Sequence, residues 1–141
     1  MKFDEIAKKT MELGLRIGEY ALFGSVPLAA HGIRESHDID IIATHEVYER
    51  LKRLGWKEEQ LPNGRKMLQK DCFEVGDDWN FGTYNPGSAT LIKDAEIVEG
   101  IPVVRLEEVL KWKRALGREK DMTDIELINK FMKQKESHVQ T

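Results

Sequence analysis

The stretch that decides the fold is Tyr20-Ala21-Leu22-Phe23-Gly24-Ser25, followed downstream by Asp38-Ile39-Asp40-Ile41-Ile42-Ala43. The apolar run that ends at Gly24 predicts a short buried strand. Ser25 is a favoured residue for the N-cap of a helix, and a proline in the first turn supports a short helix to about His31. The second stretch predicts another strand, so the sequence indicates a strand–helix–strand unit near the N-terminus.

Alternation within the second strand separates its charged side chains from its apolar ones. Residues i and i+2 of a strand point to the same face, so Asp38 and Asp40 project together, while Ile39 and Ile41 face the other way. Two adjacent carboxylates repel each other unless a cation or a shared proton lies between them. Mg²⁺ commonly binds one or two carboxylates together with substrate phosphates. The pair therefore predicts either a magnesium site or two solvated carboxylates on an edge strand.

The turn at Gly24-Ser25 predicts an anion site. Backbone N–H groups at the start of a helix point at an anion, and a glycine lets a phosphate approach closely. An ordinary N-cap explains the same two residues. Taken with the two aspartates, the turn favours a site that holds phosphates at one end and a metal at the other.

The rest of the chain predicts a single α/β (α+β) domain over residues 1–135, with a mixed sheet flanked by helices and a frayed tail at 136–141. Asn63-Gly64 is a hairpin turn signal, and 76–90 resembles a loop. Further helices are expected at 3–17, 46–54, 106–116 and 122–132, and further strands at 65–68, 72–75, 96–98 and 101–104.

Composition limits the class of protein. Hydrophobic residues make up 40% and charged residues 33%, which suits a folded domain rather than a disordered chain. The apolar runs are far shorter than the roughly 20 residues that span a bilayer. The single cysteine, Cys72, excludes an intramolecular disulfide and a multi-cysteine zinc site, so a reducing, cytoplasmic location is expected. A net charge of −3 argues against a protein that coats nucleic acid by bulk charge.

Gly24-Ser25 and the segment Arg34-Glu35-Ser36-His37-Asp38-Ile39-Asp40 together resemble the signature of the polymerase-beta-like nucleotidyltransferase superfamily. The resemblance covers about half of the chain. It implies that Gly24 and Ser25 seat phosphates and that Asp38 and Asp40 bind Mg²⁺, or Mn²⁺ in its place. The spacing from Arg34 to Asp40 is similar to the branch of abortive-infection type nucleotidyltransferase toxins, which implies that Arg34 contacts the nucleotide.

The same resemblance implies a third carboxylate on a neighbouring strand. Glu74 fits that place because alternation sets it opposite to Phe73 and Val75, and it would act as a metal ligand or a base. Asp77 and Asp78 follow directly and remain rivals, since they could equally cap the turn after the strand. Most members of the superfamily carry an aspartate at this place, so a glutamate here leaves catalytic competence open.

The last candidate site residues are basic side chains on the two C-terminal helices. Lys113 lies on the apolar face of the helix at 106–116, where it either reaches water as a snorkelling lysine or meets an anion. The segment from Lys120 to Asp124 is similar to the C-terminal motif of the toxin-like branch. That similarity implies that Lys113 and Lys120 contact the triphosphate, with Arg118 as a further candidate. The carboxylates in this segment could instead stabilise the start of the last helix.

Together these features predict a Mg²⁺-dependent nucleotidyltransferase that transfers a nucleoside monophosphate from an NTP and releases pyrophosphate. The resemblance suggests an RNA end, a protein hydroxyl or a small molecule such as an aminoglycoside as acceptor, and the short chain favours a homodimer or a partner protein. The alternatives are a non-catalytic nucleotide-binding or regulatory module of toxin–antitoxin type, and a plain α/β protein with a surface Asp-x-Asp. Trp79, Phe81 and Tyr84 could stack a base, cover the core or form a dimer contact.

Overall fold

The computed structural model describes residues 1–139, and its centre is a mixed sheet. Within that range the sheet has seven strands in the order β3-β4-β5-β2-β1-β7-β6. The pairs β1–β7 and β2–β5 are parallel, and the other neighbouring pairs are antiparallel. The strands are β1 (Tyr20–Phe23), β2 (Ile39–Ala43), β3 (Lys57–Gln60), β4 (Lys66–Lys70), β5 (Phe73–Gly76), β6 (Glu96–Val98) and β7 (Ile101–Val103).

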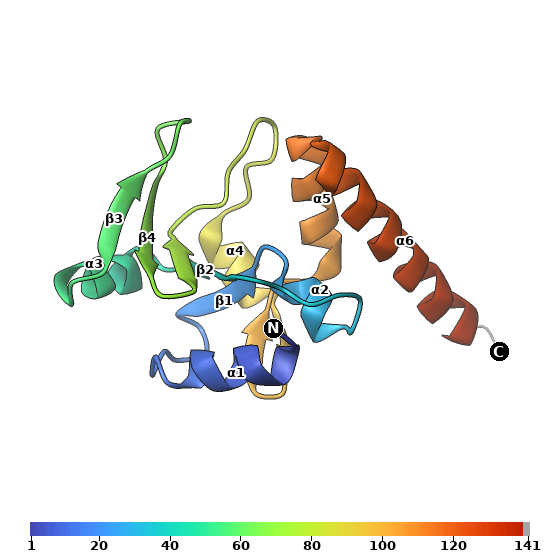
Figure 1. Cartoon of the computed structure of the whole chain (residues 1–141), viewed down its shortest axis with the longest axis horizontal. Helices are drawn as coiled ribbons and strands as arrows, with labels where there is room; N and C mark the ends of the chain where they lie inside the picture. The colour runs from blue at the N-terminus through green and yellow to red at the C-terminus, as the bar shows by residue number, and fades with distance from the viewer. Residues whose placement is uncertain (140–141) are drawn as a thin grey trace.

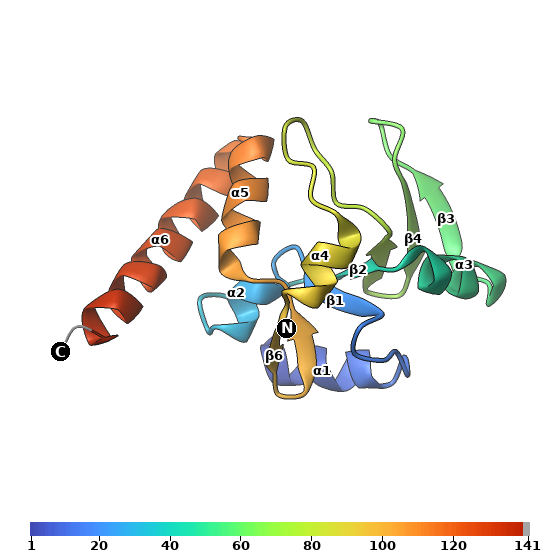
Figure 2. The same cartoon turned by 180° about the vertical axis from the view of Figure 1, so that it is seen from behind.

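Helices cover both faces of the sheet (Figures 1 and 2). In both views the tip of the β3–β4 hairpin, the loop before α4 and the corner between α5 and α6 point the same way, and α1 lies at the other end of the molecule. The C-terminal half of α6 extends away from the sheet. The helices are α1 (Phe3–Met11), α2 (Val26–Ala30), α3 (His45–Arg53), α4 (Ser88–Lys93), α5 (Leu106–Leu116) and α6 (Glu119–Val139).

The sheet separates two hydrophobic clusters, and β2 shows how the sequence does this. Ile39 and Ile41 face the cluster that α1 and α3 cover. Ile42 faces the cluster that α4, α5 and α6 cover. Strand alternation places Asp40 on the same side as Ile42. A carboxylate is thus set on the face where α5 and α6 pack, at the edge of the apolar cluster.

The structure confirms the predicted single α+β domain with a mixed sheet flanked by helices. The predicted helix at 3–17 ends earlier, at Met11, because Gly14 lies in the left-handed region and turns the chain. The last helix is longer than 122–132 and includes residues 136–139 of the predicted tail. Residues 140–141 of that tail lie outside the described residues, and fraying there stays a prediction.

Two elements were not expected from the sequence. Strand β3 has the sequence Lys-Glu-Glu-Gln, whose charged side chains lie at an edge of the sheet and carry no apolar alternation. Helix α4 starts at Ser88 inside the segment predicted to be a loop. Among the described residues, no helix is both long enough and apolar enough to cross a membrane.

Candidate functional site

A cleft of about 700 Å³ opens on the face of the sheet that carries Asp40. Its lining comes from the turn after β1, from β2, β4 and β5, from the loop after β5, and from the corner between α5 and α6. Eight residues were the main site candidates, and the cleft brings together seven of them: Gly24, Ser25, Arg34, Asp40, Glu74, Lys113 and Lys120. The eighth, Asp38, is exposed just before β2 and does not line it.

Asp40 and Glu74 lie side by side in the cleft. They occupy paired positions of the neighbouring parallel strands β2 and β5, so their side chains leave the sheet on the same face. The rival carboxylates are engaged elsewhere: Asp77 contacts His45 Nδ1 at 3.0 Å, and Asp78 contacts Arg65 Nε at 2.8 Å. Of the three candidates for a third carboxylate, Glu74 is the one that shares a site with Asp40.

Gly24 permits the close approach of the turn to Asp40. Its φ is +62°, in the left-handed region that favours glycine. A Cβ at this position would lie 1.9 Å from Oδ2 of Asp40 and within 3 Å of that residue's Cγ and Cβ. Two local features therefore require glycine at this position: the left-handed turn and the carboxylate packed against its backbone.

The environment of Asp40 disfavours a negative charge. Burial raises the pKa of Asp40 well above its ordinary value, and the charge of Glu74, a hydrogen bond with it and the charge of Asp38 act in the same direction. The positive charge of Lys113 offsets this only in part. The buried Oδ1 of Asp40 has no partner among the described residues. The carboxyl pair therefore requires either a proton or a cation.

The raised pKa predicts how stability depends on pH. The folded state holds a proton on Asp40 that the unfolded state loses near its ordinary pKa of about 4. As pH rises from about 4 through the folded pKa, this group lowers the free energy of unfolding, and the loss persists above it. We expect Asp40→Asn to be more stable than the wild type at neutral pH, with the gap closing toward pH 4.

Urea denaturation of both proteins between pH 4 and 8 measures this difference. Asp94→Asn is the matched control, because Asp94 is exposed and does not line the cleft, so its removal should change stability little. A gap between wild type and Asp40→Asn that does not vary with pH would show that the carboxyl is not perturbed by its surroundings.

Beside the carboxyl pair lies a partly buried ion cluster in which Lys113, Asp121 and Asp124 are buried and two arginines reach the surface. We call it the α5–α6 ion cluster: Arg34, Lys113, Arg118, Asp121 and Asp124. Lys113 Nζ lies 2.9 Å from Asp124 Oδ2 and 3.4 Å from Asp121 Oδ1. Arg34 donates to both carboxylate oxygens of Asp124 at 2.8 Å. Arg118 donates to both oxygens of Asp121, at 2.7 and 3.1 Å.

The cluster keeps its two carboxylates charged. Burial raises the pKa of Asp121, but the hydrogen bonds and charges of Arg118 and Lys113 outweigh it and hold that pKa below its ordinary value. Burial likewise raises the pKa of Asp124, but the hydrogen bonds and charges of Arg34 and Lys113 outweigh it and hold that pKa below its ordinary value. Their contribution to stability is therefore present above pH 4 and lost as pH falls through the lowered pKa values. The carboxylates that the sequence placed at the start of the last helix bind three cations as well.

The structure decides between the two alternatives for Lys113 and corrects one expectation for Ser25. Lys113 does not snorkel to water but meets anions: it is 4% exposed, and its ammonium lies between Asp121 and Asp124. Ser25 occupies the N-cap position of α2, but its side chain makes no capping hydrogen bond. Its Oγ instead accepts a hydrogen bond from Arg34 Nη2 at 2.8 Å. Sequence spacing gave no sign of this contact, because Arg34 reaches Ser25 only through the loop between α2 and β2.

A divalent cation fits part of this arrangement. Among the side chains that the structure describes, which end at residue 136, no group of three or more His, Cys, Asp and Glu is placed to hold a metal. Asp40 and Glu74 nonetheless form a pair with an unpartnered buried oxygen, and Mg²⁺ needs only one or two carboxylates when substrate phosphates complete its shell. The residues present fit a Mg²⁺ ion that arrives with a phosphate ligand.

The aromatic residues divide between two places. Trp79 lines the cleft with Trp112, which the sequence had not singled out, while Phe81 and Tyr84 do not line it. Trp79 is 3% exposed and stacks on Phe23 with ring centroids 5.2 Å apart, so it belongs to the core as well. Arg65, also missed, lines the cleft and lies over the Trp79 ring.

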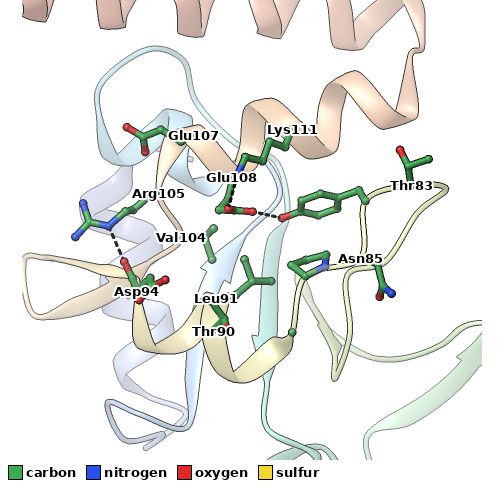
Figure 3. Close-up of a pocket in the computed structure, with 13 residues that line it drawn as sticks. Thr83, Asn85, Thr90, Leu91, Asp94, Val104, Arg105, Glu107, Glu108 and Lys111 are labelled. Atoms are coloured by element: carbon green, nitrogen blue, oxygen red, sulfur yellow. Dashed lines mark hydrogen bonds and ion pairs between the residues drawn. The ribbon is translucent and has the colours of Figure 1, made fainter.

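A second pocket of about 520 Å³ lies between the 83–91 segment and the start of α5 (Figure 3). Its polar groups bind one another: the Tyr84 hydroxyl donates to Glu108 at 2.9 Å, Lys111 contacts Glu108 at 3.1 Å, and Arg105 donates to the Asp94 carbonyl. Burial and the Glu108 bond raise the pKa of Tyr84, so its hydroxyl stays protonated. None of the residues singled out from the sequence as site residues lines this pocket, and Tyr84, Glu108, Lys111 and Arg105 are already engaged there, so the cleft is the better candidate site.

Comparison with known proteins adds no family assignment. The chain matches no protein-family model, and no curated protein matches it. The function must therefore be argued from the cleft itself.

Proposed function

We propose that the chain is a Mg²⁺-dependent nucleotidyltransferase that transfers a nucleoside monophosphate from an NTP to an acceptor. The observation that carries the proposal is the in-register pair of Asp40 and Glu74 in a cleft that Gly24, Arg118 and Lys120 also line. Paired carboxylates beside cationic side chains suit a ligand that brings both a metal ion and phosphates. The sequence resemblance to polymerase-beta-like enzymes supports the same reaction.

The chain's own residues would divide the work as follows. Asp40 and Glu74 would hold Mg²⁺, which when bound neutralises charge on the triphosphate and on the leaving pyrophosphate. Lys120 is exposed at the cleft and is free to meet the outer phosphates. Gly24 leaves room for the Asp40 carboxylate to lie against the backbone of the turn, which holds this ligand in place. The α5–α6 ion cluster fixes Arg34 and Arg118 at the rim, so their positions need no ordering when the nucleotide binds.

A second candidate is a non-catalytic module that binds or senses a nucleotide. Two observations favour it: the described residues hold no group of three metal-type ligands, and the cations Arg34, Lys113 and Arg118 already have carboxylate partners. Both candidates require Mg²⁺-dependent NTP binding in the cleft, and they differ in turnover. Only the enzyme needs an acceptor, which could be an RNA end, a protein hydroxyl or a small molecule. Only the enzyme, likewise, would need a surface for that acceptor from a homodimer or a partner protein.

Ligand linkage gives the first test. A ligand that binds only the folded state at a hundredfold excess over its Kd adds about 2.7 kcal/mol to the free energy of unfolding. For a domain of this size we expect Mg²⁺ plus ATP to raise Tm by several degrees. ATP with EDTA, or Mg²⁺ alone, should raise Tm less. Equal Tm shifts with and without EDTA would show that nucleotide binding does not depend on a metal ion at this site.

Labelled nucleotide separates the two candidates. With ATP labelled at the α-phosphorus, an enzyme transfers label to RNA, to protein or to a small acceptor in a cell extract, and label at the γ-phosphorus leaves with pyrophosphate. Asp40→Asn and Glu74→Gln should abolish the transfer while the protein stays folded. A protein that binds Mg²⁺ and ATP but transfers no α-label in such extracts would favour the non-catalytic module.

A further inference from the structure

One part of the cleft is aromatic and apolar rather than charged. Leu61, Met67, Trp79 and Trp112 line it, and Arg65 lies among them. The Arg65 guanidinium lies over the Trp79 ring, 5.6 Å from the centroid, and pairs with a carboxylate beside it at 2.8 Å. A neutralised guanidinium in this position offers a flat surface more than a free charge.

Trp79 carries an unused hydrogen-bond donor. The residue is 3% exposed, and its indole Nε1 has no partner among the described residues. A buried tryptophan N–H usually finds an acceptor. Phe23 stacks on the ring at an interplanar angle of 15°, so the indole is held in place by its packing. The free protein thus leaves one fixed, buried donor without an acceptor, on a residue that lines the cleft.

Trp112 joins this apolar part to the charged part. It is half-buried and meets Phe23 and Trp79 edge to face, at interplanar angles of 81° and 67°. The next residue is Lys113, at the centre of the α5–α6 ion cluster, and its ammonium lies 5.2 Å from the Trp112 ring centroid. An aromatic surface therefore adjoins the part of the cleft that would receive phosphates.

We infer that Trp112, Trp79 and Arg65 form a nucleobase subsite within the cleft. A nucleobase complements this lining. It has a planar ring that can lie against Trp112, and ring or carbonyl acceptors for the Trp79 N–H. In a nucleotide the base is joined through ribose to phosphates, which the neighbouring part of the cleft suits. The volume of about 700 Å³ lies within the usual range for small-molecule sites, roughly 300–1,000 Å³. The inference rests on the proposed function.

Two probes separate the base from the phosphates. Mg²⁺–ATP carries both, whereas Mg²⁺–tripolyphosphate carries the phosphates alone. Replacing Trp112 with leucine keeps apolar bulk but removes the aromatic face. We expect Trp112→Leu to bind Mg²⁺–ATP about 5- to 150-fold more weakly than the wild type, the range of base–aromatic stacking, and to bind Mg²⁺–tripolyphosphate unchanged. Phe81→Leu is the matched control, because Phe81 lies in the loop after Trp79 but does not line the cleft.

Tryptophan fluorescence gives a readout in the unaltered protein. The chain has three tryptophans. Trp56 packs against Phe73 in the cluster on the other face of the sheet, so it reports on no ligand in the cleft. ATP with Mg²⁺ should quench the emission of the wild type and of Trp56→Phe, and tripolyphosphate should not. Trp112→Phe, which keeps a smaller aromatic ring, should retain part of the affinity that Trp112→Leu loses.

The outcomes distinguish the subsite from the proposed function. If the wild type binds tripolyphosphate as tightly as ATP, or if Trp112→Leu keeps the full affinity for ATP, the nucleobase subsite is wrong and the phosphate and metal site stands. If the wild type binds neither probe, the proposed function falls and the subsite falls with it. A preference for ATP that disappears in Trp112→Leu establishes the subsite.

Discussion

Replacing Lys113 with methionine is expected to lower the free energy of unfolding by about 3 kcal/mol, the lower end of the cost of breaking a buried ion pair. Methionine keeps the apolar stem but removes the ammonium that lies between Asp121 and Asp124. Both carboxylates are buried, at 0% and 6% exposure. Arg34 and Arg118 still neutralise part of the charge, which places the expected cost at the lower end. Urea denaturation at pH 7 measures the change.

Lys111→Met is the matched control, because it removes the same charge two positions earlier on α5. Lys111 is exposed and pairs with Glu108 on the surface, so its loss should cost less than about 1 kcal/mol. A Lys113→Met protein as stable as the wild type would mean that the lysine behaves as a snorkelling side chain, as the sequence alone allowed, and that the ion cluster does not hold α6 to the domain.

Replacing Gly24 with alanine is expected to cost about 3 kcal/mol and to abolish Mg²⁺-dependent nucleotide binding. An L-residue at φ +62° costs about 1–2 kcal/mol by itself. The added Cβ would also meet three atoms of Asp40 at 1.9 to 2.9 Å, so the turn or the aspartate must move at the further cost of overpacking, about 1–3 kcal/mol. Urea denaturation measures the free energy of unfolding. Titration with Mg²⁺ and ATP measures the nucleotide affinity that is lost when the Asp40 carboxylate is displaced.

Gly32→Ala separates the two causes. Gly32 has a similar φ of +70°, but nothing lies within 4 Å of its Cβ position. We expect it to lose only the cost of the backbone conformation, about 1–2 kcal/mol, and to bind nucleotide as the wild type does. Equal losses in Gly24→Ala and Gly32→Ala would show that the turn relaxes away from Asp40 and that the close approach does not restrict the site.

Local pattern was enough to predict the core of the fold. The apolar runs at β1 and β2, the alternation around Glu74 and the helical periodicity of α5 are signals that neighbouring residues carry. The Gly24–Ser25 turn and the position of Asp40 follow from the same short stretch. Strand β3 has no such signal, because it gains its pairing from β4 while its charged side chains stay at the sheet edge.

The contacts that build the cleft are long-range, and the sequence does not show them. Arg34 and Asp124 lie 90 positions apart in the chain, and their bidentate pair depends on how α6 returns along α5. The burial of Lys113 depends on the same packing, so periodicity could place it on an apolar face but could not show its partners. Trp112 and Arg65 carry no motif, and only the assembled cleft brings them together.

The most direct test is a calorimetric titration of ATP into the wild type and Asp40→Asn, each with Mg²⁺ and with EDTA. We predict that the wild type binds ATP with Mg²⁺ and much more weakly with EDTA. Asp40→Asn should lose the magnesium-dependent part of that affinity while remaining folded, because the amide keeps the shape of the side chain and removes its charge. If Asp40→Asn binds ATP with Mg²⁺ as tightly as the wild type does, the Asp40–Glu74 pair is not the metal site and the proposed function is wrong.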